Sequence, residues 1–389
     1  MAYSITEAKN LVIQAGKTLV ESGLIARTWG NISARISDTQ FVITPSGLAY
    51  ETLTPEQIVL INIADCSYQG EVKPSSEKGI HADTYRLRPE VNFVIHTHQV
   101  MASVISIEGK NLFVTKSEYK KVLGEIVPCA GYGMPSTNKL RKEVAAAIKV
   151  HSFSKAILMK YHGTLCMGND MEHSFEIAQT LEQLATEKYL SICQNTEVNT
   201  PYTSDYGNSV RIGNSFRLKW DKYTCDYEIG NLPYAAPNAA YLHELIYKSS
   251  KVNSIIHTTE EEIIKVSRYG KDLKPYLDDL AQIAGVYIKT VDSDIRKPDN
   301  FVNNLRNKNA VLIENGGALC TGETVEDAVA VSMVLKKGCI ADIYCRNLNL
   351  KKCLGTLDAY IQRIIYVTKY SKKRKSVNDK DSKLLQINK

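Results

Sequence analysis

The sequence has no apolar run long enough to cross a membrane and no segment typical of a secretion signal. A spanning helix needs about 18 or more consecutive apolar residues, and no stretch of this chain reaches that length. The first residues, MAYSITEAKNLVIQAGKTLV, lack a basic segment followed by an apolar one. They place Ser4 and Glu7 at the spacing of a capping box, which predicts an amphipathic helix. We expect a cytoplasmic protein with no membrane partner.

Cysteine pairs and aromatic-rich basic segments are also missing. The nine cysteines form no CxxC pair, and an odd count without a secretion signal favours reduced thiols over disulfides or a cysteine-bound zinc. The net charge is +6, and much of the excess lies in the C-terminal stretch KYSKKRKSVNDKDSK. No aromatic residue follows Tyr370, so we expect a solvated, disordered basic tail over 371–389 and no nucleic-acid partner.

The chain does contain an internal repeat. VNFVIHTHQVMASVIS, from Val91, aligns without gaps with VNSIIHTTEEEIIKVS, from Val252. AILMKYHGTLCMGND, from Ala156, aligns likewise with AVLIENGGALCTGET, from Ala310. The order of these blocks and their approximate separation are the same in both halves. The repeat therefore indicates two copies of one domain, of which the second is divergent.

The composition supports two globular domains. The chain has 389 residues, of which 44% are apolar and 23% charged, and each half is long enough to bury a core of its own. Strand patterns and helix patterns are mixed in both copies, which predicts an α/β sandwich for each. We place the first domain at 1–205 and the second at 206–370, followed by the tail.

Two histidines lie one residue apart in the apolar stretch VIHTHQV. On a strand, residues two apart point to the same face, so the imidazoles of His96 and His98 can meet one cation. Such a pair on its own is more often incidental. His162, however, ends another apolar strand directly before a glycine, and Glu77 lies at the expected start of a helix. Three imidazoles and a displaceable carboxylate make a zinc-type tetrahedral set that can open for a substrate.

Small and hydroxyl-bearing residues gather in three turns, TWGN, TPSG and PSSE. Hydroxyl, amide and backbone N–H groups donate to anions. PSSE also precedes a helix, whose N-terminus is partially positive and which Ser75 or Ser76 is expected to cap. Each turn alone is better explained as a turn or a cap. Beside a metal set, they predict a phosphate cradle made of Thr28, Gly30, Asn31, Ser46, Gly47, Ser75 and Ser76.

GNIS, ITPSG, PSSE, HTH and HG, in this order and at these separations, resemble the class II aldolase/adducin family over nearly all of the first copy. The resemblance implies a three-layer α/β/α sandwich with a mixed, mostly antiparallel central sheet. It also implies one Zn²⁺ per chain, bound by His96, His98 and His162 in the first copy. Glu77 would be an additional ligand and the acid/base for C–H cleavage. All the cradle residues except Gly30 match the family's phosphate-binding positions.

Some residues match the family less cleanly. Its aldolases use a tyrosine from a neighbouring subunit, in the region of TKSEYKKVLGEIVP. Tyr119 is the catalytic candidate here, although a count back from VPCA places Ser117 at the matching position. His81 lies one turn after Glu77. It can support the metal ligands from behind, or it can be an ordinary polar helix residue.

The second copy keeps the pattern and loses this chemistry. At the positions of the four metal-site residues, taken in chain order, it has Ala239, His257, Thr259 and Gly316. One histidine cannot make this site, so we expect a non-catalytic second copy. The resemblance implies assemblies with active sites between subunits. We therefore expect a homo-oligomer, either a dimer that forms a pseudo-tetramer or a larger one, in which the second copy supplies side chains to the first copy's site.

The favoured function is a zinc-dependent aldolase that cleaves a short-chain ketose phosphate by retro-aldol chemistry, with a small phosphorylated sugar as the substrate. The alternatives are a pentulose-phosphate 4-epimerase and a phospho-keto-acid decarboxylase, because each needs an enediolate stabilised in the same way. An adducin-like binding module is the alternative of another class.

Overall fold

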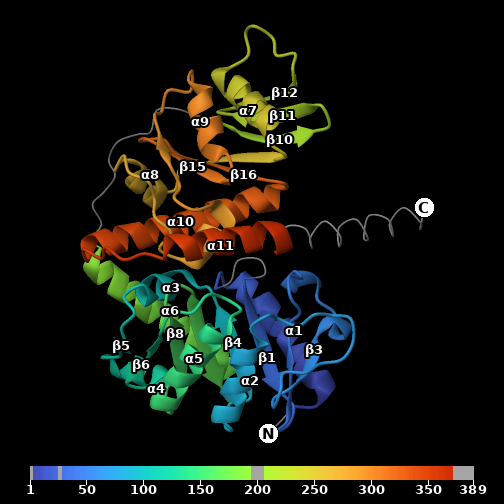
Figure 1. Cartoon of the computed structure of the whole chain (residues 1–389), viewed down its shortest axis with the longest axis vertical. Helices are drawn as coiled ribbons and strands as arrows, with labels where there is room; N and C mark the ends of the chain where they lie inside the picture. Colours follow the sequence, from blue (N-terminus) through green and yellow to red (C-terminus); the bar gives the residue numbers. More distant parts are fainter. Residues whose placement is uncertain (1–2, 25–28, 194–205, 371–389) are drawn as a thin grey trace, which may run out of the picture. The chain divides into compact units, whose positions relative to one another are not determined.

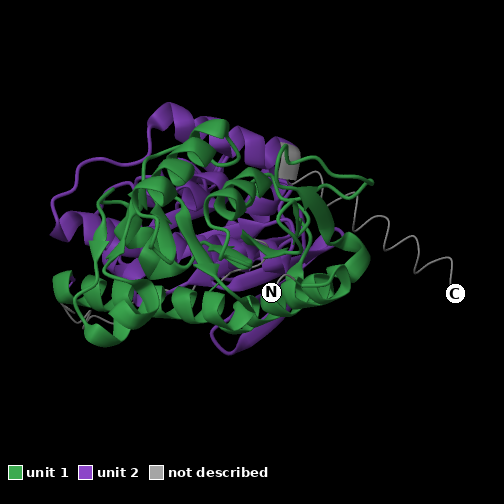
Figure 2. Ribbon diagram, turned by 90° about the horizontal axis from the view of Figure 1, so that it is seen from below, with its two compact units in different colours: residues 1–192, 369–389 green, residues 193–368 purple. Residues whose placement is uncertain are grey.

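The computed structural model describes residues 3–24, 29–193 and 206–370, with the side chains of the last two residues excepted. The described chain separates into two compact units, one of residues up to 192 with 369–370 and one of residues 193–368, which Figure 2 shows in different colours. Each unit is described by itself. Among the described residues, no helix combines the length and the apolar character needed to span a membrane.

The first unit is built on a mixed sheet of seven strands in the order β3-β2-β1-β4-β9-β8-β7. Only β7 and β8 run parallel; the other neighbouring pairs are antiparallel. The strands are β1 (Gly30–Arg35), β2 (Gln40–Ile43), β3 (Val59–Asn62), β4 (Phe93–Thr97), β7 (Cys129–Ala130), β8 (Ala156–Met159) and β9 (Gly163–Gly168). A separate small sheet pairs β5 (Leu112–Phe113) with β6 (Ile126–Val127).

Helices cover both faces of this sheet (Figure 1). They are α1 (Ile5–Glu21), α2 (Lys78–Leu87), α3 (Val100–Ser106), α4 (Ser117–Leu123), α5 (Asn138–Val150) and α6 (Met171–Ile192). The apolar sides of α2 and α5 join strand side chains in one buried cluster on one face. Helices α1, α3 and α6 pack against the other face. Two short 3₁₀ turns, η1 (Tyr50–Thr52) and η2 (Pro55–Gln57), precede β3. The three-layer α/β/α sandwich expected from the resemblance is therefore present.

The second unit repeats the sheet in the order β12-β11-β10-β13-β16-β15-β14, again with one parallel pair at its end, β14 with β15. Its strands are β10 (Asn208–Ile212), β11 (Ser215–Trp220), β12 (Tyr223–Glu228), β13 (Ser254–Thr258), β14 (Thr290–Val291), β15 (Ala310–Ile313) and β16 (Gly317–Gly322). Its helical elements are α7 (Asn238–Ser249), α8 (Glu261–Ser267), η3 (Leu280–Ala284), α9 (Pro298–Leu305), α10 (Val325–Asn347), α11 (Thr356–Ile365) and η4 (Tyr366–Tyr370). The fold thus occurs twice, as the sequence repeat predicts.

Strand register fixes which residues of the two units correspond. Ser33 of β1 lies opposite Val94 of β4, and Ser209 of β10 lies opposite Ile255 of β13. Because Val94 and Ile255 align in the repeat, Ser33 corresponds to Ser209. By the same count Asn31, two residues earlier, corresponds to a glycine, Gly207.

Two expectations about helix starts have different outcomes. The capping box of Ser4 and Glu7 is present at the start of α1 and is confirmed. The expectation that Ser75 or Ser76 caps α2 is wrong: Glu77 occupies the capping position and makes no capping bond. The Ser75 hydroxyl instead accepts a hydrogen bond from the Glu77 backbone N–H at 3.3 Å. The Glu77 carboxylate is turned away from the helix because it is held by other side chains.

Candidate metal centre

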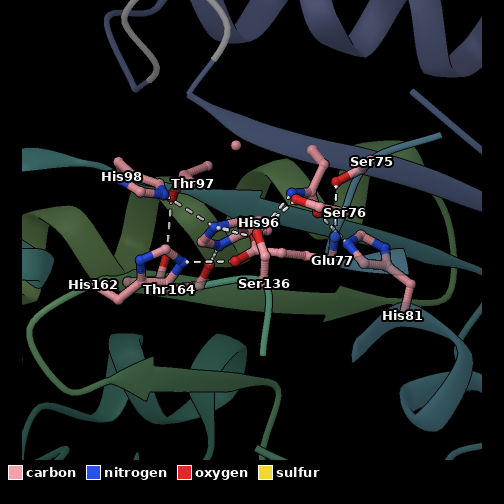
Figure 3. A network of polar contacts seen from close by, with 12 residues as sticks. Ser75, Ser76, Glu77, His81, His96, Thr97, His98, Ser136, His162 and Thr164 are labelled. Atoms are coloured by element: carbon pink, nitrogen blue, oxygen red, sulfur yellow. Dashed lines mark hydrogen bonds and ion pairs between the residues drawn. The ribbon is translucent and has the colours of Figure 1, made fainter. Parts of the chain in front are cut away.

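Three sequence-distant elements of the first unit bring the predicted metal ligands together (Figure 3). His96 lies on β4, and His98 directly follows that strand. β9 pairs with β4, with His96 opposite Leu165, and His162 comes from the turn just before β9. Glu77 lies at the start of α2. The structure therefore places in one cluster the four residues that the sequence predicts as ligands.

The donor atoms of the three histidines lie within 4.8 Å of one another. The Nε2 atoms of His96 and His98 are 3.1 Å apart. Nitrogen ligands at about 2.0–2.1 Å from a tetrahedral zinc ion lie roughly 3.3 Å from each other. The set is therefore compact enough to share one ion with small movements of the rings.

His96 is fixed in the protonation state that a metal ligand needs. Its Nδ1 lies 2.7 Å from the backbone carbonyl oxygen of Thr164. A carbonyl only accepts, so Nδ1 carries a proton and Nε2 is the nitrogen that faces the cluster, where it can offer its lone pair to a bound ion. A backbone carbonyl behind a histidine ligand is the usual support for such a ligand.

The Glu77 carboxylate contacts two of the three histidines, His96 and His162. Its Oε2 lies 3.2 Å from His96 Nε2, and its Oε1 lies 3.3 Å from His162 Nε2. Asn31 donates from Nδ2 to Oε2 at 3.1 Å. Burial by itself raises the pKa of the Glu77 carboxyl, but the imidazoles of His162 and His96 hold it well below its ordinary value. Glu77 is therefore an anion, as a carboxylate ligand must be.

His162 reaches the cluster from a tight turn between β8 and β9. Tyr161 has a φ of 65°, a left-handed conformation that is uncommon for a bulky residue. At Gly163, a Cβ atom would lie 2.3 Å from the Thr97 carbonyl oxygen and 3.2 Å from His96 Cε1. Only glycine allows the turn to approach β4 this closely, which gives the His-Gly pair of the sequence its physical reason.

The residues present fit a divalent metal of the zinc type. Three imidazole nitrogens and one carboxylate oxygen converge, the carboxylate is ionised, and His96 has its proton on the distant nitrogen. His96 and Glu77 are both buried, being 1% and 8% exposed. A buried carboxylate among buried imidazoles is costly unless an ion or a proton compensates the charges.

Two of the predicted phosphate-binding turns lie side by side. The backbone N–H of Ser46 donates to the Lys73 carbonyl oxygen at 2.9 Å, and that of Ser75 donates to the Thr44 carbonyl oxygen at 3.0 Å. Pro45 and Pro74 pair in an isolated bridge between the same segments. The backbone thereby brings TPSG and PSSE together although they are separated by about 25 residues in sequence.

Gly47 opens the first of these turns. It has a φ of 79°, and a Cβ atom there would meet nothing within 4 Å, so the space beside it is open. The hydroxyl of Ser76 lies 2.7 Å from that of Ser136, which is itself in a left-handed conformation with a φ of 64°. A cavity of about 130 Å³ beside these two serines is lined in part by Ser76, Glu77 and Ser136 and does not include Gly47.

The remaining cradle candidates are placed differently. Asn31 is buried and directs its amide to Glu77. The carbonyl oxygen of Gly30 accepts from the Tyr50 hydroxyl at 2.9 Å. Thr28 lies outside the described residues.

Tyr119 lies apart from this cluster in the contacts that the structure describes for it. It is on α4, and its hydroxyl donates to Glu187 of α6 at 2.6 Å. Its ring lies near the Lys116 ammonium group, which also pairs with Glu187. The catalytic role of Tyr119 stays a prediction.

Sequence reasoning missed two supporting residues. Thr164 supports His96 through its backbone carbonyl, which no side-chain pattern can reveal. Ser136 contacts Ser76 from a turn, MPST, that carries Pro and Ser as ordinary turn residues do. The contact of Thr164 with His96 could have been predicted only from the pairing of β4 with β9, and only with the register of these two strands known.

The equivalent position in the second unit is built differently. Nε2 of His257, on β13, lies 2.7 Å from the Gly316 carbonyl oxygen. Because a carbonyl only accepts, this Nε2 carries the proton and has no lone pair to offer a metal. Thr259 and Gly316 stand where the other imidazoles would be. Across the described ranges, the histidine trio of the first unit is the metal-capable cluster.

Comparison with known proteins also finds two copies of one domain in this chain. The model of the Class II Aldolase and Adducin N-terminal domain matches residues 10–189 and again residues 215–342. The L-fuculose phosphate aldolase of Escherichia coli (strain K12) is 32% identical over 194 residues, which are 50% of this chain and 87% of that protein.

Two further similarities involve sugar-phosphate aldolases. The 5-methylthioribulose-1-phosphate/5-deoxyribulose-1-phosphate aldolase of Escherichia coli O45:K1 is 34% identical over 174 residues, which are 45% of this chain and 79% of that protein. A solved L-fuculose 1-phosphate aldolase structure has a TM-score of 0.46 and 29% identity, covering 52% of this chain and 92% of that one. Since the family model matches most of the sequence, in two segments, this chain belongs to the class II aldolase and adducin family and carries the family's domain twice.

Proposed function

We propose that the first domain is a zinc-dependent aldolase that cleaves a short-chain ketose phosphate by retro-aldol chemistry. The observation that carries the proposal is the convergence of His96, His98, His162 and Glu77 on one point next to the open turns of Ser46–Gly47 and Ser75–Ser76. The similarity to aldolases of L-fuculose phosphate and of methylthioribulose 1-phosphate supports this class of substrate.

The three histidines would hold the ion, with Glu77 as the displaceable fourth ligand. When bound, a divalent ion supplies a Lewis acid that polarises the substrate's carbonyl oxygen and favours negative charge next to it. The Thr164 carbonyl keeps His96 in the ligating tautomer throughout.

Glu77 is the group placed to move a proton at carbon. In the cleavage direction the bond between the carbon alpha to the carbonyl and the hydroxyl-bearing carbon breaks. The ionised Glu77 carboxylate accepts the proton of that hydroxyl, whose carbon becomes the aldehyde carbon, and the electron pair of the broken bond stays on the ketone fragment as an enediolate. Glu77 then delivers a proton to that carbon, and in the condensation direction it removes one. The low pKa of the Glu77 carboxyl keeps it ionised, so that it can accept a proton.

The paired serine turns would hold the phosphate. The hydroxyls of Ser46, Ser75 and Ser76 and the open side of Gly47 together offer donors and space for a tetrahedral anion. Holding the phosphate at a fixed distance from the metal ligands orients the reacting carbons, which contributes to the rate through positioning. Asn31 and Thr28 remain candidates for the same role.

The second domain would be structural in this scheme. His257 is the single histidine at its former metal position, and it is bonded to a backbone carbonyl. We propose that this domain serves assembly: it takes the place of an identical neighbour, so that two chains form a pseudo-tetramer, and contributes side chains to the catalytic site. Mass measurement in solution would contradict the assembly if the active protein is a monomer.

The deciding experiment couples metal analysis to a screen of phosphorylated ketoses. Purified protein should contain about one zinc ion per chain and release a ketone phosphate and an aldehyde from at least one substrate. H98A should lose both the ion and the cleavage, while H257A, the matched control in the second domain, should keep both. Epimer formation without aldehyde release would favour the epimerase instead. Absence of bound metal and of any turnover would favour a binding module.

A further inference from the structure

A chain of buried side chains lies behind Glu77, on the side away from the histidine ligands. Asn31 contacts Glu77, His81 contacts Asn31 through its Nε2, and Ser33 lies 2.6 Å from His81 Nδ1. The Tyr85 hydroxyl lies 2.7 Å from the Ser33 hydroxyl. His81, labelled in Figure 3, is completely buried.

Hydrogen-bond balance fixes the direction of each contact in this chain. Glu77 only accepts, so Asn31 must turn its NH₂ group toward the carboxylate. The Asn31 carbonyl oxygen then faces His81, and His81 must donate to it from Nε2. His81 Nδ1 is left to accept from Ser33. One tautomer of His81 and one orientation of Asn31 satisfy all of these contacts.

The second unit contains half of the same chain. His243 Nδ1 lies 2.7 Å from the Ser209 hydroxyl, which in turn lies 2.6 Å from the Tyr247 hydroxyl. The serine, histidine and tyrosine are therefore present in both units. The other half is absent there, because Gly207 replaces Asn31 and Ala239 replaces Glu77.

This comparison separates two roles of the histidine. The contact with serine and tyrosine occurs with and without a metal centre, so it belongs to the fold. The contact with asparagine occurs only where a glutamate ligand has to be held. The first copy therefore uses a fold-supporting histidine for a second task.

We propose that His81 is a positioning residue of the metal centre: it fixes the orientation of the Asn31 carboxamide and thereby holds the Glu77 carboxylate between His96 and His162. The inference rests on the proposed function only in taking Glu77 as a metal ligand. It assigns His81 no contact with substrate or ion.

His81 is suited to this task because it is a constant donor. Burial, and after it the charge of His96, lowers the pKa of the His81 imidazole to about 3. At neutral pH the His81 ring is therefore uncharged and carries a single proton, on Nε2. A group that changed its charge there would alter the field at Glu77.

Without a donor at position 81, no hydrogen bond selects one of the two orientations of the Asn31 carboxamide. An asparagine side chain is nearly symmetric in shape, and a flip would direct its carbonyl oxygen at the carboxylate. Two acceptors facing each other in a buried place repel, so Glu77 would move away from the histidines.

The test compares H81L with H243L, which removes the same histidine, with its serine and tyrosine contacts, from the domain that lacks a metal centre. Zn²⁺ affinity is measured on the full chain by competition with a chelator, without substrate. We expect H81L to weaken Zn²⁺ binding by roughly 10–100-fold and H243L to leave it unchanged. Equal affinities in wild type and H81L would overturn the inference.

Two further variants separate positioning from loss of folding. H81Q restores a donor toward Asn31 and an acceptor toward Ser33, and should recover most of the affinity. In an N31A background, H81L should cause no additional loss, because His81 acts through Asn31. Additive losses would mean that His81 affects the metal by another route.

A crystal structure of metal-free H81L provides a readout that needs neither metal nor activity. The Glu77 carboxylate should be displaced from the positions next to His96 and His162; an unchanged carboxylate would refute the inference. If wild type and the variants differ in Zn²⁺ affinity as expected but no ketose phosphate is cleaved, the proposed function fails and this inference stands.

Discussion

His96 and His257 occupy the same strand position in the two domains but carry their protons on opposite ring nitrogens. His96 donates from Nδ1 to the Thr164 carbonyl oxygen, whereas His257 donates from Nε2 to the Gly316 carbonyl oxygen, each at 2.7 Å. In His96 the Nε2 atom is left to bind an ion, whereas in His257 the same nitrogen contacts a backbone carbonyl. For each of the four metal-site residues of the first domain, the second domain has an aligned position that can be compared with it.

The histidine ligands are the first target. Replacing His162 with alanine should remove the bound metal and lower kcat by roughly 10²–10³-fold, because loss of the ion removes several kcal/mol of charge stabilisation. Elemental analysis and steady-state kinetics on the same preparation measure both. The control is H257A. If H162A kept its metal and its rate, His162 would not be a ligand.

Restoring the second site needs more than a histidine. At Gly316 a Cβ atom would lie 2.8 Å from Ile313 Cγ2, whereas the first domain has the flexible Met159 at the position of Ile313. We expect G316H to lower the free energy of unfolding by about 1–3 kcal/mol, and I313M to recover part of that loss.

The combination A239E/T259H/G316H/I313M should still bind only one ion per chain, because the backbone carbonyl of residue 316 continues to hold the proton of His257 on Nε2. Urea unfolding and metal analysis provide the measurements. A fully stable G316H single variant would show that this turn has more room than its geometry indicates.

Gly47 distinguishes the phosphate cradle from an ordinary turn. G47A places a side chain on a residue with a φ of 79° and fills the open side of the turn. Gly213, in the second domain, has a φ of 62° and equally open surroundings, so G213A costs a similar amount, about 1 kcal/mol, in backbone strain alone. We expect KM to rise, by about tenfold if roughly 1.4 kcal/mol of phosphate binding is lost, in G47A only. A similar KM in both variants would remove Gly47 from the cradle.

Acid stability should depend on His81. Its pKa is lowered to about 3 by burial and by His96, whereas in the unfolded chain it is about 6.5. Below pH 6.5 the unfolded chain therefore binds a proton that the folded chain does not, so stability falls as the pH decreases from about 6.5 toward 3. In metal-free protein, H81Q should flatten the dependence of the urea midpoint on pH between 7.5 and 5. An unchanged slope would mean that other groups dominate it.

The residues that could be predicted are those whose spacing has a direct geometric meaning. The HxH pair at the end of β4 brings two imidazoles close together, and the glycine after His162 allows the close turn beside it. Glu77 was assigned through a motif. The two copies followed from matched blocks of sequence, and their sheets have the same strand order.

The rest depends on contacts between distant segments. The phosphate-binding role of Asn31 stays a prediction, but its contact with the Glu77 carboxylate was not foreseen, because it depends on the pairing of β1 with β4 that places Asn31 opposite His96. The alternatives for His81 could not be separated from sequence, because its partners lie 48 and 50 residues away. The serine cap of α2 was predicted from local propensity, whereas Glu77 occupies the capping position and its carboxylate contacts His96 and His162.

The repeated sheet order has a genetic consequence. In an assembly of identical chains, every substitution appears in all subunits at once, so a change that suits one surface is imposed on every catalytic centre. Here two differently built domains are translated from one message, always in equal numbers, and a change in one leaves the other untouched. A single gene thus encodes both a domain that keeps the metal-capable histidine cluster and a second domain that is free to diverge.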